Sequence, residues 1–246
     1  MSQDLSEPSQ AVPSRVTACL RALGLSRFKL IGKQVYQAYS PSFGWVAVKI
    51  AISPSARLQL QIEARFLAKF TSEHWPSYID FGSHQQVDWL ITSLCNGIPL
   101  SAAVIGQSQR LALLSQSEAI LQQLHGSGFI HGDIKPSNII VNESDQQLTL
   151  IDFGSVLPIG EHYQTLTSSL SPRFSGANAT YRYGQVTPRD DYVALAITLQ
   201  TVFHHHPFDS LPISQFCHTQ RSAQAPHLPS RYQILLQQQL KLAKQR

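Results

Sequence analysis

The residues of this chain best suited to chemistry lie in a polar loop and in a short sequence that follows it. In the loop sequence HGDIKPSN, Asp133 is followed by Lys135 and Asn138, and Asp152 opens the sequence DFG further along. Carboxylate and amide oxygens are ligands that Mg²⁺ accepts, and a carboxylate can take the proton of an attacking hydroxyl. These groups suit phosphoryl transfer, in which a protein holds a nucleotide, neutralises phosphate charge and aims an acceptor oxygen.

Two charged residues upstream give weaker signals when each is taken alone. Lys49 lies in the strand-like run VAVKI, and Glu63 lies on the next predicted helix, from which it would fix the ammonium group by an ion pair. The simpler interpretation places the stem of Lys49 along a strand end and Glu63 on a solvated helix face. DFG alone would likewise be a turn that ends a strand. The order and spacing of all the pieces together favour the catalytic interpretation.

The first half of the chain must supply the elements that position Lys49 and Glu63. Its opening residues are rich in Ser, Gln and Pro, and then Val16, Leu20 and Leu23 predict a short amphipathic helix before Gly24. The runs FKLIG, VYQAYS and WVAVKI predict three strands. A helix over residues 55–70 and strands over 78–81 and 87–93 complete a small sheet with one main helix.

The second half is mainly helical after the Asn96-Gly97 break. Leucines at helical spacing predict a helix over residues 109–124, and two apolar runs bound the polar loop. DDYVALAITLQTVF predicts an apolar helix whose opening acids suit the helix dipole, and a last helix is expected over 232–244. A sheet in the first half of the chain followed by helices in the second half predicts an α+β fold.

Taken in order, these motifs resemble the protein kinase family over roughly residues 28–208. The resemblance implies a bilobal fold, with an antiparallel-sheet N-lobe over residues 27–95 and a mainly helical C-lobe over 96–246, preceded by an extension over 1–26. The stretch DDYVALA is typical of the bacterial members of the eukaryotic-type Ser/Thr kinases. The implied cofactors are ATP and Mg²⁺, and the implied partners are protein substrates.

The resemblance also implies a role for each site residue. Asp133 would take the proton of the substrate hydroxyl, Lys135 would reach the γ-phosphate as in members that act on Ser or Thr, and Asn138 and Asp152 would bind Mg²⁺. Lys49 would contact the α- and β-phosphates while pairing with Glu63. The remaining implied positions are adenine contacts from Val35, Ala47 and Ile140, a hinge from Thr92 and Ser93 to Cys95, a phosphate-loop glycine at Gly32, packing by His131, Leu67 and Phe153, and a loop anchor at Asp191.

Several positions depart from the family pattern. Gly32 is the one glycine kept in LIGKQVYQA, so close approach of backbone amides to phosphate is in doubt. Gly132 replaces the Arg that reads a phosphate on the activation segment, so switching by phosphorylation is not expected. The acid of the APE motif is missing, with Ser171-Pro172-Arg173 the best match and Tyr183-Gly184-Gln185 the second. The chain after His206-Pro207-Phe208 is short, which predicts a shortened C-lobe.

Composition excludes several other classes of protein. The chain has 246 residues, 43% of them hydrophobic, and a net charge of +4 from scattered basic residues, which is too weak to indicate nucleic-acid binding. Cys19, Cys95 and Cys217 are widely spaced, which suits reduced thiols and a cytoplasmic location. The polar N-terminus and the lack of an apolar run of about 18 residues predict neither a secretory signal nor a membrane span. His204-His205-His206 has no carboxylate pair nearby and is interpreted as structural.

Three hypotheses follow from the sequence. The leading one is ATP- and Mg²⁺-dependent phosphorylation of Ser or Thr in proteins. A small-molecule kinase of the aminoglycoside or choline kinase type also uses HGD with a later Asn, but Lys135-Pro136 and the HPF stretch argue against it. A pseudokinase, acting as a nucleotide-binding or regulatory module, is favoured by the degenerate Gly-rich loop and the missing APE acid. The sequence does not set the substrate or the oligomeric state.

Overall fold

The computed structural model describes residues 14–166 and 170–246, so Thr167, Ser168 and Ser169 of the activation segment lie outside the described residues. The chain divides into two compact units. The first consists of residues 1–60 and 78–94, and the second of residues 61–77 and 95–246. The expected boundary at residue 95 is close to this division. The structure, however, also assigns the segment over 61–77 to the second unit.

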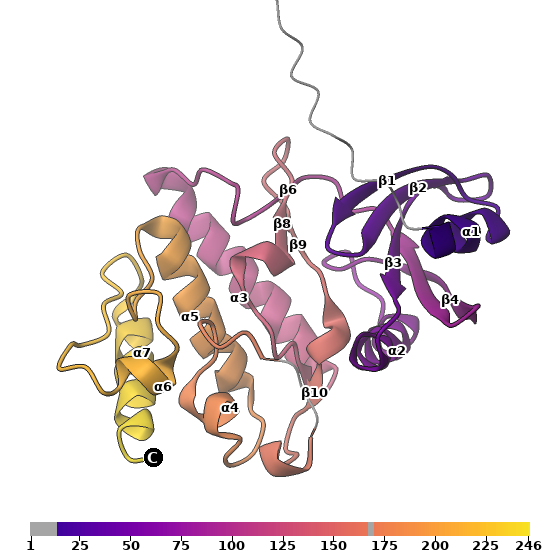
Figure 1. The fold of residues 1–246 in the computed structure, drawn as a ribbon. Helices are drawn as coiled ribbons and strands as arrows, with labels where there is room; N and C mark the ends of the chain where they lie inside the picture. Colours follow the sequence, from indigo (N-terminus) through magenta and orange to yellow (C-terminus); the bar gives the residue numbers. More distant parts are fainter. Residues whose placement is uncertain (1–13, 167–169) are drawn as a thin grey trace, which may run out of the picture. The chain divides into compact units, whose positions relative to one another are not determined.

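The first unit is built on a five-stranded sheet in which all neighbours are antiparallel, in the order β1-β2-β3-β5-β4 (Figure 1). The strands match the runs expected from β-branched and aromatic residues. Their bounds are β1 Ser26–Gly32, β2 Val35–Ser40, β3 Gly44–Ala51, β4 Tyr78–His84 and β5 Val87–Ser93. The expected meander of three strands followed by two more is confirmed.

Helix α1 (Ser14–Ala22) packs on the sheet of the first unit (Figure 1). Its apolar face, Val16, Cys19 and Leu20, is buried in one core with inward-facing residues of β2, β3 and β5. Because side chains alternate along a strand, the residues between the inward-facing ones form the opposite face of the sheet. The lead-in helix is therefore part of the core of this unit.

Helix α2 (Pro54–Lys69) runs across the division between the units. Near its start, Arg57 Nη2 lies 2.9 Å from Asp88 Oδ1 of β5, within the first unit. Near its end, Phe66 packs among aromatic residues of the second unit, including Phe129 and Phe153. One helix thus makes side-chain contacts within both units.

The second unit is organised around three long helices, α3 (Arg110–Gly126), α5 (Pro188–Phe203) and α7 (Ser230–Ala243), with α5 packed against both of the others (Figure 1). Every residue from Val193 to Gln200 is buried, as expected for a helix that is apolar on all sides. Its start is fixed by Asp190, whose Oδ2 accepts the backbone N–H of Thr187 at 2.8 Å. The short helices are α4 Ala177–Tyr181 and α6 Ile213–Phe216, with 3-10 turns at Gln107–Gln109, Pro136–Asn138, Phe153–Ser155 and Tyr163–Thr165.

Short strands hold the polar loops of the second unit. One sheet has the order β6-β8-β9, and β10 pairs with β7. Strand β7 enters the HGDIKPSN loop, β8 leaves it, and β9 leads into DFG. The bounds are β6 Ile98–Pro99, β7 Phe129–Ile130, β8 Ile139–Val141, β9 Leu148–Leu150 and β10 Leu157–Pro158. No helix formed by residues 14–166 or 170–246 is long and apolar enough to cross a membrane.

Candidate functional site

The HGDIKPSN loop is anchored from α5 by the carboxylate of Asp191. Its Oδ2 accepts the backbone N–H of His131 at 2.7 Å, and its Oδ1 accepts that of Gly132 at 3.0 Å. Asp191 is buried in the first turn of α5, where the helix dipole favours a negative charge. The expected anchoring contact is confirmed, and it fixes the backbone directly before Asp133.

His131 is fully buried, and both of its ring nitrogens form hydrogen bonds with the backbone around the loop. Its Nε2 lies 3.1 Å from the carbonyl oxygen of Ile151, and its Nδ1 accepts the backbone N–H of Asp133 at 3.3 Å. These partners assign the neutral tautomer with the proton on Nε2. Burial lowers the pKa of His131, which agrees with a neutral ring. The expected packing of His131 against Phe153 is present, with ring centroids 5.0 Å apart.

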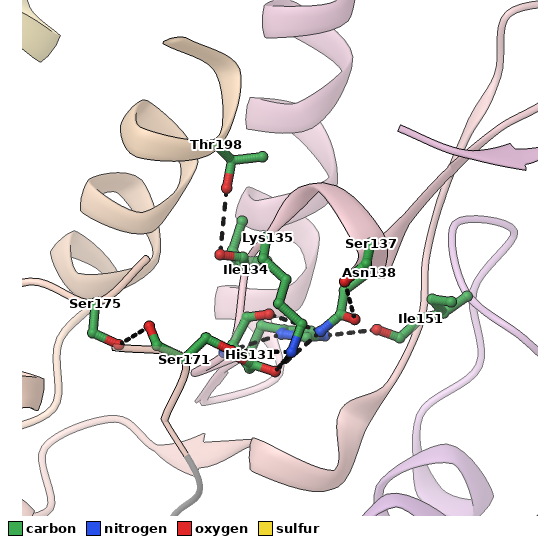
Figure 2. A network of polar contacts seen from close by, with 10 residues as sticks. His131, Ile134, Lys135, Ser137, Asn138, Ile151, Ser171, Ser175 and Thr198 are labelled. Atoms are coloured by element: carbon green, nitrogen blue, oxygen red, sulfur yellow. Dashed lines mark hydrogen bonds and ion pairs between the residues drawn. The ribbon is translucent and has the colours of Figure 1, made fainter. Parts of the chain in front are cut away.

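Asp133, Lys135 and Asn138 form one polar network, and Figure 2 shows the side chains of Lys135 and Asn138 converging in it. Lys135 Nζ donates to Asp133 Oδ2 at 2.6 Å, and Asn138 Nδ2 donates to the same oxygen at 3.2 Å. The other carboxylate oxygen, Oδ1, is buried and has no hydrogen-bond partner among the described residues. A buried acceptor without a partner is costly, so this oxygen is suited to receive a donor from a ligand.

Asn138 is oriented by its amide nitrogen, which also donates to the carbonyl oxygen of Asp133 at 2.9 Å. Its Oδ1 accepts a hydrogen bond from the hydroxyl of Ser137, at 3.5 Å. The N–H of Ile151 donates to the carbonyl oxygen of Asn138 at 2.9 Å, which brings the residue before Asp152 against the loop. The two residues expected to bind Mg²⁺, an amide and a carboxylate that both offer hard oxygen donors, therefore come from neighbouring backbone segments.

Ser171 enters this network from the activation segment, which the sequence did not indicate. Its hydroxyl accepts a hydrogen bond from Lys135 Nζ at 3.0 Å, and its carbonyl oxygen accepts one from Ser175 at 3.0 Å (Figure 2). The sequence offered Ser171 as the start of an APE-like motif. Its only other signal was the abundance of hydroxyl residues in this segment, which does not single out one partner for Lys135.

Phe153 is packed among aromatic rings, more of them than the sequence indicated. Phe66 of α2 stacks on it with centroids 4.8 Å apart and planes 7° from parallel, and Trp75 lies at 5.7 Å. Leu67, which was expected to pack here, is also fully buried. Asp152 itself has a left-handed backbone, with φ of 72°, so the chain turns sharply between β9 and the Phe153–Ser155 turn.

Gly132 lies against the activation segment more closely than a side chain would allow. Its φ is 77°, and a Cβ built on it would meet the carbonyl oxygen of Ser155 at 2.4 Å. Next to this contact, β10 pairs with β7, with Leu157 opposite Ile130. The glycine that replaces the family's Arg is therefore required sterically in this conformation.

The missing APE acid has a neutral substitute in the second unit. Gln239 of α7 is buried, and its Oε1 accepts the backbone N–H of Ala177 at 2.8 Å, at the start of α4. At the end of α4, Arg182 donates to the carbonyl oxygen of Tyr163 at 2.6 Å. These two hydrogen bonds, one on each side of α4, anchor the described end of the activation segment.

The site residues expected in the first unit lie on adjoining strands. Val35 of β2 is opposite Lys49 of β3, and Ala47 of β3 is opposite Thr92 of β5. Ala47 and Lys49 are two residues apart and therefore share the sheet face that α1 does not cover. In the same unit Gly32 pairs with Val35 and Ser93 pairs with Val46. The remaining expected positions belong to the second unit: Ile140 pairs with Thr149, Glu63 is buried in α2, and Cys95 follows shortly after β5.

Comparisons with known proteins point to one family. The sequence profile of the protein kinase domain matches residues 32–244. Serine/threonine-protein kinase PknE of Mycobacterium bovis is 30% identical over 146 residues, covering 54% of this chain and 26% of PknE. Serine/threonine-protein kinase PknH of the same species is 27% identical over 197 residues, covering 71% of this chain and 33% of PknH. Serine/threonine-protein kinase D of Synechocystis is 37% identical over 82 residues, covering 33% of this chain and 16% of that kinase.

Proposed function

Because this chain belongs to the protein kinase family, we propose that it transfers the γ-phosphate of ATP to Ser or Thr hydroxyls of protein substrates with Mg²⁺ as cofactor. The observation that carries the proposal is the buried Oδ1 of Asp133, which has no partner among the described residues although the carboxylate is in a network with Lys135 and Asn138. The names of the relatives, all serine/threonine-protein kinases, support the choice of acceptor. This chain spans about a quarter to a third of PknE and PknH, so the activity is proposed for the domain it contains.

Asp133 acts on the acceptor in this proposal. Its Oδ1 accepts the hydrogen bond of the substrate hydroxyl, whose oxygen attacks the γ-phosphorus while the bond to the bridging β,γ-oxygen breaks. The hydroxyl proton passes to Asp133, and ADP leaves with the bridging oxygen. Lys135 Nζ, 2.6 Å from Oδ2 of Asp133, stabilises the carboxylate before transfer and adds positive charge beside the phosphoryl group.

The nucleotide and metal roles follow the family resemblance. Asn138 Oδ1 and the carboxylate of Asp152 are the oxygen donors that would hold Mg²⁺, which supplies charge neutralisation on the phosphates when bound. Lys49 is assigned to the α- and β-phosphates and Glu63 to the ion pair that fixes it. The adenine and phosphate-loop positions are assigned to Gly32, Val35, Ala47, Thr92, Ser93, Cys95 and Ile140.

A second candidate function, a pseudokinase that binds partners without turnover, has one observation in its favour. Only Lys33 and Gln34 separate β1 from β2, Gly32 pairs directly with Val35, and Gln34 has a φ of 62°. Such a tight turn offers few backbone amides to phosphate. Weak ATP binding is the consequence that this geometry favours.

A phosphate-transfer assay decides between the two functions. With ATP labelled on the γ-phosphate, we expect Mg²⁺-dependent label in a generic basic protein or in the chain itself, and little in inorganic phosphate. Asp152→Asn should remove the Mg²⁺-dependent rise in melting temperature that ATP gives the wild type, since the site loses the charge that holds the metal. If the wild-type chain binds ATP but no acceptor becomes labelled, the pseudokinase function is favoured. If the Asp152→Asn variant keeps the Mg²⁺-dependent rise in melting temperature, the metal role assigned to Asp152 is contradicted.

A further inference from the structure

A hollow of about 410 Å³ opens in the second unit beside the candidate base, and we call it the flanking hollow. It lies where the segment after β6, the start of the Pro136–Asn138 turn, the activation segment and the end of α5 meet. Its volume is in the range of pockets that accept a large side chain. The lining residues are Leu100, Ser101, Ala103, Lys135, Pro136, Ser137, Phe174, Thr201 and Val202.

The chemistry of the flanking hollow is apolar with a single cation. Leucine, alanine, proline, phenylalanine and valine side chains form most of its wall, and the other uncharged members carry hydroxyls. Lys135 is the only charged residue among the described residues that line it, and no Asp or Glu is among them. An Arg or Lys side chain placed here would lose water without gaining a carboxylate and would be repelled by Lys135.

The flanking hollow is continuous with the candidate site through Lys135. The same side chain that lines the hollow places its Nζ 2.6 Å from Asp133 Oδ2 and 3.0 Å from the hydroxyl of Ser171. A polypeptide whose hydroxyl reaches Asp133 would therefore carry a neighbouring residue past this hollow. Val104, which directly follows Ala103, is 94% exposed and extends the apolar surface outward.

We propose that the flanking hollow binds an uncharged, apolar side chain next to the acceptor Ser or Thr of the substrate polypeptide, and that it selects against a basic residue there. Burying such a side chain gains the hydrophobic free energy that the apolar wall offers. The proposal rests on the proposed function because it takes Asp133 as the position of the acceptor hydroxyl. It adds the substrate class, namely polypeptides with an apolar residue beside the acceptor.

Matched peptides test the preference. Each position within three residues of a single Ser is set in turn to Leu, Arg or Glu in an otherwise Ala-rich peptide, and kcat/KM is compared. We expect Leu to exceed both Arg and Glu by tenfold or more at one position. Equal rates at every position, or a preference for Arg or Glu at each selective position, would overturn the proposal.

Two substitutions of the same kind locate the preference in the flanking hollow. Ala103 lines it, whereas the exposed neighbour Ala102 does not. In Ala103→Glu, kcat/KM for the peptide with Arg at the selective position should exceed kcat/KM for the peptide with Leu there. In Ala102→Glu, the Leu peptide should keep the higher kcat/KM, as in the wild type. The same change of order in both variants, or in neither, would overturn the assignment to this hollow.

Binding measurements separate a failure of this proposal from a failure of the proposed function. The peptides are repeated with Ala in place of the acceptor Ser, and their dissociation constants are measured for the wild type, Ala103→Glu and Ala102→Glu. Tighter binding of the Leu peptide, reversed only in Ala103→Glu, supports the hollow even if no phosphate is transferred. Equal binding of Leu and Arg peptides overturns it even if the chain is an active kinase.

Discussion

At the scale of single residues, the two oxygens of Asp133 have different environments, and this difference defines the chemistry. Oδ2 receives the ammonium of Lys135 and the amide of Asn138, so it is fully used within the protein. Oδ1 is buried and has no partner in the described part of the chain. A carboxylate held by one oxygen and open at the other is positioned to receive a donor from outside.

The first prediction concerns this open oxygen. Asp133→Asn should leave ATP binding near the wild-type level and lower phosphate transfer by about 10²–10³-fold, since removing one positioned electrostatic group commonly costs that much. ATP binding by thermal shift and single-turnover transfer are the two measurements. Asp145→Asn, on an exposed loop, is the control and should change neither. Weakened ATP binding with unchanged turnover at saturation would contradict the role.

The second prediction concerns Gly132, where a Cβ would meet Ser155 O at 2.4 Å. Gly128 also has a positive φ, of 86°, but a Cβ there would have nothing within 4 Å. Both Gly→Ala variants incur the strain of a left-handed backbone, and only Gly132→Ala adds a clash, which should cost a further ~1–3 kcal/mol of unfolding free energy. Urea unfolding of the two variants measures the difference. Equal destabilisation would show that the contact with Ser155 is not maintained.

At the scale of elements, the activation segment is held at both ends by contacts that need no phosphate. Its start is fixed by the pairing of β10 with β7 and by the close approach of Ser155 to the loop. Its end is fixed by Gln239 at the start of α4 and by Arg182 at the end of that helix. Backbone pairing at the start, and hydrogen bonds between side chains and backbone at the end, hold the segment without the phosphate that anchors a phosphorylated one.

The third prediction sets Ser171, whose hydroxyl contacts Lys135, apart from the other hydroxyl residues of this segment. Thr165→Ala, Thr167→Ala, Ser168→Ala and Ser169→Ala together should leave phosphate transfer within a few-fold of wild type. Ser171→Ala should lower transfer about tenfold, because its hydroxyl binds Lys135 Nζ and hydrogen bonds to charged groups are worth roughly 1.5–3 kcal/mol. Transfer assays on both variants provide the comparison. If the fourfold variant loses activity, and Asp or Glu at one of the four positions restores it, then phosphorylation of this segment does control activity.

At the scale of the whole molecule, the sequence predicted what depends on local pattern. The sheet and the main helices follow from alternation and helical spacing, and the contact of Asp191 with the catalytic loop was implied by the family resemblance. Gln239 binding to Ala177 and Ser171 binding to Lys135 join residues far apart in the chain. A Gln in a helix or a Ser in a hydroxyl-rich loop has no local pattern that names its partner, so these contacts needed the structure.

The assignment of residues 61–77 to the second unit was also beyond the sequence. Helix α2 forms an ion pair with Asp88 of the first unit through Arg57, and it packs on Phe153 of the second unit through Phe66. Periodicity predicts that such a helix is half buried, but it does not say that two units share it. The same reason explains why Phe66 was missed as a neighbour of Phe153.

The stability of the molecule should depend on pH through two buried histidines. His206 donates from Nε2 to the carbonyl oxygen of Arg173 at 2.7 Å and accepts the N–H of Phe208 at Nδ1, at 3.1 Å, so its ring is neutral. Burial lowers the pKa of His206, as it does that of His131. In the unfolded chain each histidine takes a proton near pH 6.5, whereas in the folded chain it does so only at lower pH.

The sign of the effect follows from the protons that each state binds. Between the unfolded and folded pKa values, the unfolded state holds more protons, so this contribution is complete above about pH 6.5 and is lost as the pH falls, by ~1.4 kcal/mol per pH unit for each histidine. Asp190 acts in the opposite direction at lower pH, because burial raises the pKa of its carboxyl.

The last prediction is therefore a fall in the free energy of unfolding between pH 6.5 and 5.5, measured by urea unfolding. His206→Asn should reduce the slope by about one proton's contribution, ~1.4 kcal/mol per pH unit, since one of the two buried groups no longer titrates. His218→Asn, at an exposed position, is the matched control and should keep the wild-type slope. A wild-type stability that does not change over this range, or a His206→Asn variant with the full slope, would show that His206 is protonated in the folded protein and would contradict the neutral ring assigned from its two backbone contacts.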